Sequence, residues 1–172
     1  MKRLLLALIT ASGAAFCWAK GDYMTLDTFL NLAFHETEPS PAALWFSGDQ
    51  REDIKGMVGR EPAVLRQRYW GQGRRTAWVL EEIGKERPIT IAIAVEAERI
   101  SRLEILSFRE SRGWEVRYPF FTDQFIGISL DDDGQLSEHV DGITGATLSV
   151  RAVKKVAKLA LYMHGQTPYA DE

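Results

Sequence analysis

Residues 141–149 read Asp-Gly-Ile-Thr-Gly-Ala-Thr-Leu-Ser, and the pattern after them predicts an amphipathic helix from about residue 148 to 164. This stretch places the hydroxyl of Thr147 on a turn of small residues where the helix begins. Small residues allow a bulky ligand to approach the backbone, and the free N–H groups and positive dipole end of a helix favour an anion. The segment predicts a site that holds a phosphate beside a hydroxyl. An ordinary helix start with a tight turn uses the same residue types.

The chain before this stretch predicts several antiparallel strands. Residues 65–70 and 76–83 flank Gly71-Gln72-Gly73 in a hairpin pattern, and isoleucines alternate with small residues over 89–95 before a further strand at 101–108. Residues 119–126 predict one or two helical turns. Helices are expected at 25–34 and 49–58, with a break at 38–41 between them. Adjacent strands with helices at both ends predict an α+β domain.

The C-terminal helix has an apolar stripe on one side and a basic stripe on the other. The basic residues are Arg151, Lys154, Lys155 and Lys158. In an acidic protein such a stripe could steer an acidic electron donor or acceptor, although lysines on a solvated helix face need no partner.

The N-terminus has the pattern of a secretory signal. Lys2 and Arg3 precede a short apolar segment, and Cys17-Trp-Ala19 places small residues suitably for cleavage after Ala19. We therefore expect a signal peptide at 1–19, a helical preface at 20–64 and the main domain at 65–172, in a periplasmic protein that is not transmembrane after cleavage. A retained anchor or a lipid on Cys17 is the alternative.

Composition excludes several classes of function. Cys17 is the only cysteine, so a chain cleaved after Ala19 has no disulfide, iron–sulfur cluster or thiolate zinc site. The three histidines lack metal-ligand spacing, and no catalytic triad motif is present. The formal net charge is −3, or −5 without Lys2 and Arg3, which makes nucleic acid a poor candidate partner.

The stretch at 141–147 resembles the Asp-x-x-(Ser/Thr)-Gly-Ala-Thr motif of the FMN-binding domain family. Asp141 matches the leading aspartate, Thr144 the Ser/Thr position, and Gly145 and Ala146 the two small residues. The family includes the flavin-carrying subunits of the sodium-pumping NADH:quinone oxidoreductase and of the Rnf complex. There a flavin transferase joins the FMN phosphate to the last threonine, which corresponds to Thr147. The resemblance implies a twisted antiparallel sheet with this threonine opening a helix beside it.

A second segment carries the resemblance further. Glu110-Ser-Arg-Gly-Trp114 is similar to a family loop that follows the central hairpin and lies against the flavin ring. The resemblance implies ring contacts from Glu110, Ser111, Gly113 and Trp114. In some members threonine follows the glutamate, whereas this chain has Ser111. Taken alone, Trp114 is more typical of a core residue and Glu110 of a solvated loop.

We therefore expect a periplasmic electron carrier with FMN attached covalently to Thr147. Its expected partners are a flavin transferase and redox proteins, either acidic haem proteins (cytochromes) or membrane-bound flavoproteins. Two alternatives remain open from the sequence. One is a non-flavin binding or adaptor module, and the other is a reductase that uses the attached flavin on a small acceptor.

Overall fold

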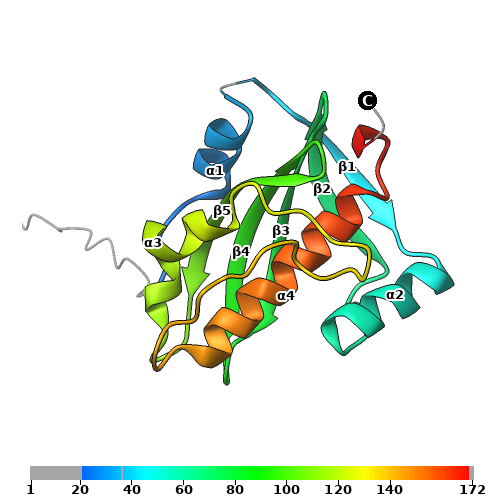
Figure 1. Cartoon of the computed structure of the whole chain (residues 1–172). Coiled ribbons are helices and arrows are strands. Elements are labelled where there is room, and N and C mark those ends of the chain that lie inside the picture. Colours follow the sequence, from blue (N-terminus) through cyan, green and yellow to red (C-terminus); the bar gives the residue numbers. More distant parts are fainter. Residues whose placement is uncertain (1–20, 36, 171–172) are drawn as a thin grey trace, which may run out of the picture.

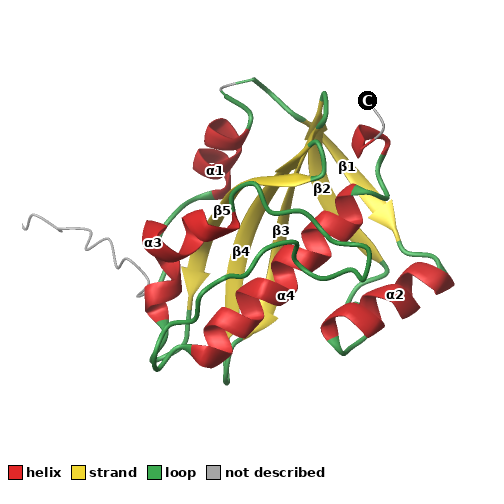
Figure 2. Ribbon diagram, in the orientation of Figure 1, coloured by secondary structure: helices red, strands yellow, loops and turns green. Residues whose placement is uncertain are grey.

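The computed structural model describes residues 21–35 and 37–170 of the chain. The predicted signal segment at 1–19, with Cys17 and the cleavage position, lies outside the described residues. The fold is built on one antiparallel sheet of five strands whose spatial order follows the sequence, with helices packed against it (Figures 1 and 2). The strands are β1 (Ser40–Trp45), β2 (Arg66–Gln72), β3 (Arg75–Ile83), β4 (Pro88–Glu96) and β5 (Arg99–Phe108). The expected α+β fold class is confirmed.

Strand β4 shows why the sheet is covered on both faces. Its large residues, such as Ile91 and Ile93, belong to the main core, whereas the intervening Ala92 and Ala94 belong to a second cluster. Because alternate side chains of a strand point to opposite faces, the two clusters lie on opposite sides of the sheet. The isoleucine and alanine alternation therefore specifies one bulky face and one face that a helix can approach closely.

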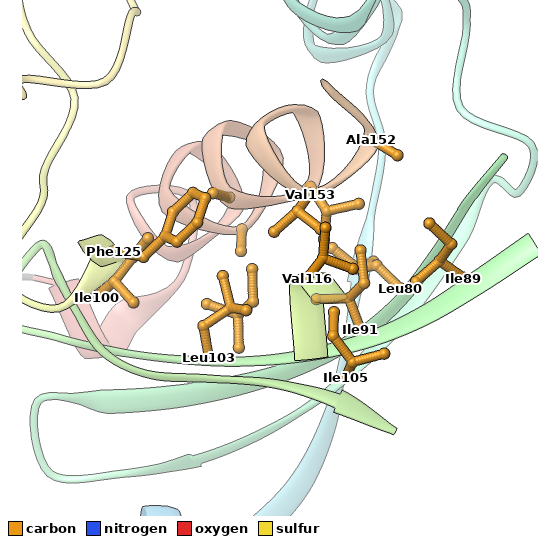
Figure 3. Packing of buried hydrophobic residues seen from close by; sticks show 14 of the residues in the cluster. Leu80, Ile89, Ile91, Ile100, Leu103, Ile105, Val116, Phe125, Ala152 and Val153 are labelled. Atoms are coloured by element: carbon orange, nitrogen blue, oxygen red, sulfur yellow. The ribbon is translucent and has the colours of Figure 1, made fainter. Parts of the chain in front are cut away.

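Helix α4 (Thr147–His164) covers the isoleucine face, and helix α1 (Leu26–Ala33) covers the alanine face. In Figure 3, side chains such as Val153 of α4 and Ile91 of the sheet meet between helix and strands. Thr25 caps α1, because its hydroxyl accepts the backbone N–H of Thr28 at 3.2 Å. Both helices form at the positions predicted from their apolar stripes.

The N-terminal part differs from the sequence prediction. The segment containing Pro41, which was expected to break the chain, forms the edge strand β1 and pairs with β2. Proline is tolerated on an edge strand because its missing N–H can face away from the ladder. The segment at 20–64, which was predicted to be a helical preface, therefore contains a strand of the sheet as well as two helices. Helix α2 (Gly48–Val58) does form, and Ser47 and Gln50 make a capping box at its start.

Short helical turns connect β5 to the stretch that leads into α4. They are the 3₁₀-helix η1 (Trp114–Arg117), α3 (Pro119–Thr122) and the 3₁₀-helix η2 (Asp123–Phe125). Phe121 and Phe125 are fully buried and pack edge to face at 5.4 Å, which fixes these turns against the main core. No helix in the described ranges is long and apolar enough to cross a membrane.

A buried polar network lies at the C-terminal end of α4. Thr76 Oγ1 accepts the indole N–H of Trp78 at 2.9 Å and is 2.8 Å from Nδ1 of His164. His164 is fully buried, and its Nε2 has no hydrogen-bond partner among the described residues. Burial lowers the pKa of His164, and Arg74 lowers it further against an opposing effect of Glu98. A buried imidazole with a lowered pKa is neutral at pH 7.

We expect this histidine to make the protein less stable in mild acid. The unfolded state takes up a proton near pH 6.5, while the folded state resists it until a lower pH, so the unfolding free energy falls as pH drops below 6.5. One such group contributes a slope of up to about 1.4 kcal/mol per pH unit. Urea unfolding of wild type and His164→Gln from pH 7.5 to 5.5 measures this. Equal slopes in the two proteins would contradict the prediction.

Candidate functional site

The site begins at the turn that starts α4. The N–H of Ala146 donates to the carbonyl of Ile143 at 3.0 Å, and Gly145 lies inside this turn with φ of +85°, a conformation that favours glycine. Thr147 is the first residue of the helix and is exposed. No side chain caps the helix at its N-terminus. Its first N–H groups are therefore left without a side-chain acceptor, as at helix starts that bind anions.

An open cavity of about 560 Å³ lies over this turn. Its lining includes Thr144 and Thr147 from the motif and two cations from the next turns of α4, Arg151 and Lys154. Lys154 is held in place because its ammonium group donates to the carbonyl of Val140 at 2.6 Å. The volume falls within the range of about 300–1,000 Å³ that is usual for small-molecule sites. Two hydroxyls and two cations at an uncapped helix start form a site suited to a phosphate.

The loop at 110–114 packs directly on this helix start. Gly113 is buried, with φ of +84°, and a Cβ added to it would lie only 2.5 Å from Oγ of Ser149 and 3.4 Å from Cβ of Ala146. Only glycine fits a position that combines this backbone conformation with so close an approach. The two sequence motifs, separated by about thirty residues, therefore meet in the fold as the resemblance implied.

Trp114 follows Gly113 and begins an exposed aromatic cluster. It is 40% exposed and packs edge to face with Tyr118 at 5.6 Å. The guanidinium of Arg117 lies over three rings, at 4.2 Å from Tyr23, 5.1 Å from Trp114 and 4.9 Å from Tyr118. Such contacts orient the rings and keep a cation among them. An exposed aromatic surface thus adjoins the start of α4.

Glu110 has a role that the sequence did not predict. One of its carboxylate oxygens accepts the backbone N–H groups of Lys85, Glu86 (2.6 Å) and Arg87 (2.9 Å) in the β3–β4 turn. Burial by itself would raise the pKa of Glu110, but these three hydrogen bonds outweigh it and lower the pKa. The structural role of Glu110 is to connect the β3–β4 turn to the loop that carries Gly113.

The structure brings together only part of the predicted set. Thr144 and Thr147 line the cavity, Gly145 and Ala146 form the turn between them, and Gly113 lies against Ala146, with Trp114 next along the chain. Ser111 is exposed. Asp141 does not line the cavity. Its N–H donates to Oε1 of Gln124, and its side chain is 83% exposed, with Oδ1 3.5 Å from Nε2 of His139.

Sequence reasoning did not assign Arg151 and Lys154 to the site. It placed both on the solvated side of the helix as part of a surface for partners. The spacing of Arg151 from Thr147 was a usable signal, because residues four apart lie on the same helix face. The packing of the segment around Val140 against the helix, which holds Lys154, has no such local signal. The described residues contain no cluster of acidic, histidine or cysteine side chains that could hold a metal.

Comparisons with known proteins agree with this architecture. Residues 84–162, from the end of β3 to the last turn of α4, match the family described as FMN-binding domain. The structure is similar to that of NqrC from Shewanella oneidensis, with a TM-score of 0.57 and 13% sequence identity over 86% of this chain and 88% of that chain. At this identity the likeness concerns the fold. No curated protein has a sequence that matches the chain significantly.

Fold and site thus define a single-sheet α+β protein with an open cavity at the start of its C-terminal helix. The family match confirms the resemblance noted in the sequence, because residues 84–162 match the FMN-binding domain family. The residues fit the cofactor's phosphate, since the hydroxyl of Thr147 and two cations line one cavity beside a helix start that has no side-chain cap.

The close packing at Gly113 leads to a stability prediction. Gly113→Ala adds about 1–2 kcal/mol of backbone cost at positive φ and about 1–3 kcal/mol from overlap with Ser149. Gly127→Ala is the matched control, because Gly127 has φ of +85° and nothing within 4 Å of an added Cβ. We expect Gly113→Ala to lower the unfolding free energy more than Gly127→Ala does. Equal losses in denaturant unfolding would show that the Gly113 contact is not tight.

The Glu110 anchor predicts an effect of charge on the fold. Glu110→Ala removes hydrogen bonds to a charged acceptor and should cost about 1.5–3 kcal/mol at pH 7. Because the folded-state pKa of Glu110 is lowered, its contribution is present above about pH 4.3 and is lost as pH falls through the folded value. Glu110→Gln keeps an acceptor without titrating, so its unfolding free energy should decline less steeply between pH 5 and 3. A steeper decline in Glu110→Gln would disprove this role.

Proposed function

We propose that this chain is a periplasmic electron-transfer flavoprotein that carries FMN joined through its phosphate to Oγ1 of Thr147. The observation that supports this most strongly is the placement of Thr147 at an uncapped helix start within a cavity that also contains Arg151 and Lys154. The match of residues 84–162 to the FMN-binding domain family supports the choice of cofactor. The signal-like N-terminal sequence supports export.

The residues of the cavity suit attachment of a phosphate. The hydroxyl of Thr147 would attack the phosphorus of a flavin donor, whose leaving group departs while the hydroxyl proton passes to a base of a flavin transferase. Arg151 and Lys154 would balance the charge on the phosphate oxygens, and the first N–H groups of α4 would donate to them. Lys154 is already oriented by its bond to Val140, so little side-chain freedom is lost when the phosphate arrives.

A covalent bond solves a problem of affinity. An exposed helix N-terminus stabilises an anion by only ~0.3–1 kcal/mol, whereas micromolar binding requires ~8 kcal/mol. A phosphoester to Thr147 prevents dissociation in a compartment where the cofactor is scarce. Bound FMN supplies the electron transfer, and the protein has to orient the ring and set its environment.

The loop beside the helix start is suited to that second task. Gly113 brings backbone close to the site, and the Trp114 and Tyr118 rings supply flat apolar surface next to it. We assign the ring to this side of the cavity. The exposure of the aromatic cluster favours electron exchange with another protein over turnover of an enclosed substrate. A reductase acting on small acceptors would instead reoxidise rapidly with soluble acceptors in the absence of any protein partner.

Intact mass spectrometry tests the attachment. When the protein is exported together with a flavin transferase, wild type should gain the mass of one FMN. Thr147→Val has nearly the same shape without the hydroxyl, so it should fold but remain colourless and gain nothing. Thr147→Ser keeps a hydroxyl and is the matched control, in which measurable loading is expected. Covalent FMN on Thr147→Val would place the linkage elsewhere and refute the assignment.

A further inference from the structure

A second cavity adjoins the Thr147 cavity along α4. It has a volume of about 380 Å³ and lies between the end of α2, the segment at 135–140 and the polar side of α4. Arg151 and Lys154 line both cavities, so the two are adjacent. Lys155 and Lys158 complete the basic lining of the second cavity, and Glu138 is the carboxylate in its lining.

Two of the three lysines of this cavity, Lys154 and Lys158, are held by hydrogen bonds to neighbouring segments. Besides the bond of Lys154 to Val140, Lys158 donates to the carbonyl of Met57 at 3.3 Å and to Oε1 of Gln135 at 3.2 Å. Tyr162 of α4 donates to Asp53 of α2 at 2.8 Å, and Gln50 of α2 donates to Gln166, just after α4, at 2.8 Å. These side chains are part of a packed interface, not the freely solvated lysines that the sequence allowed.

The positive charge of this surface is largely uncompensated. The acceptors of Lys154 and Lys158 are carbonyl and amide oxygens, which carry no net charge. Within the described ranges only Lys155 of the four cations forms an ion pair, a long one of 3.9 Å to Glu82, and Glu82 is already bound to Arg60 at 2.7 Å. A protein with a net charge of −3 thus presents a fixed cationic surface beside its cofactor site.

We propose that this basic cavity is the docking site for an acidic redox protein, whose surface carboxylates are received by Lys155 and Lys158. The inference rests on the proposed electron-transfer function. Lys158 is eleven residues from Thr147 and therefore only ~16 Å away along the helix. A partner held there would lie near the residue proposed to carry the flavin phosphate. Redox partners use small contact areas, and complementary charge raises their association rate.

The experiment measures binding of a soluble b-type cytochrome with an acidic surface, and of a c-type cytochrome with a basic surface, by calorimetry at low and high salt. The receptors are the FMN-loaded full chain, its Lys155→Gln/Lys158→Gln variant and the control Arg68→Gln/Arg74→Gln. The control removes the same charge from exposed arginines of β2 and of the β2–β3 turn. Circular dichroism and thermal unfolding verify that each variant is folded.

We expect the wild type to bind the acidic cytochrome more tightly than the basic one and to lose that binding at high salt, since the Debye length is then only a few Å. The lysine variant should bind the acidic cytochrome about tenfold more weakly at low salt, while the arginine control changes little. Equal losses in both variants, or no loss in either, would overturn the proposal. Lysine-dependent binding to vesicles containing phosphatidylglycerol, without lysine-dependent binding of the cytochrome, would also overturn it by making the surface a membrane contact.

The same titrations with Thr147→Val separate this proposal from the function on which it rests. Docking through Lys155 and Lys158 does not require the flavin, so this variant should bind the acidic cytochrome with the same dependence on the two lysines. Failure of wild type to acquire FMN would refute the proposed function while leaving these binding measurements intact. FMN-loaded protein with no lysine-dependent binding would refute docking alone.

Discussion

The contact between Gly113 and the first turn of α4 determines the geometry of the whole site. It joins the loop that follows β5 to the helix that begins at Thr147, and it leaves no room for a side chain. The helix start carries the Thr147 hydroxyl and two cations of the cavity, and the residues that follow Gly113 carry exposed aromatic rings. The arrangement suits a cofactor with an anionic phosphate at one end and a flat ring at the other.

The surrounding fold supports this contact from both directions. The bulky face of β4 fixes α4 on the sheet, and Glu110 ties the loop to the β3–β4 turn. At the polar side of α4, bonds from Lys154 and Lys158 hold neighbouring segments against the helix while their charge stays uncompensated. One face of α4 thereby packs in the core, and the other face lines the cavities proposed for the cofactor and the partner.

Local patterns in the sequence predicted much of this. The alternation over 89–95 identified the central strand, and the turn of small residues before Thr147 identified the helix start. Contacts between distant segments were not predictable, because no local pattern encodes them. The anchoring of Glu110 on residues 85–87, the burial of His164 and the holding of Lys154 by Val140 all depend on how separate elements pack. Strand β1 was missed because Pro41 signals a break, and only pairing with β2 makes it a strand.

The fluorescence lifetime of the attached flavin tests most directly whether the Gly113 contact brings the cofactor and the aromatic cluster into one site. Tryptophan and tyrosine rings in contact with a flavin quench its fluorescence by donating an electron to the excited ring. We expect a mostly quenched flavin in the loaded wild type and a longer lifetime in Trp114→Leu carrying the same mass of FMN. A lifetime equal to that of free FMN in both proteins would contradict a ring site beside Gly113.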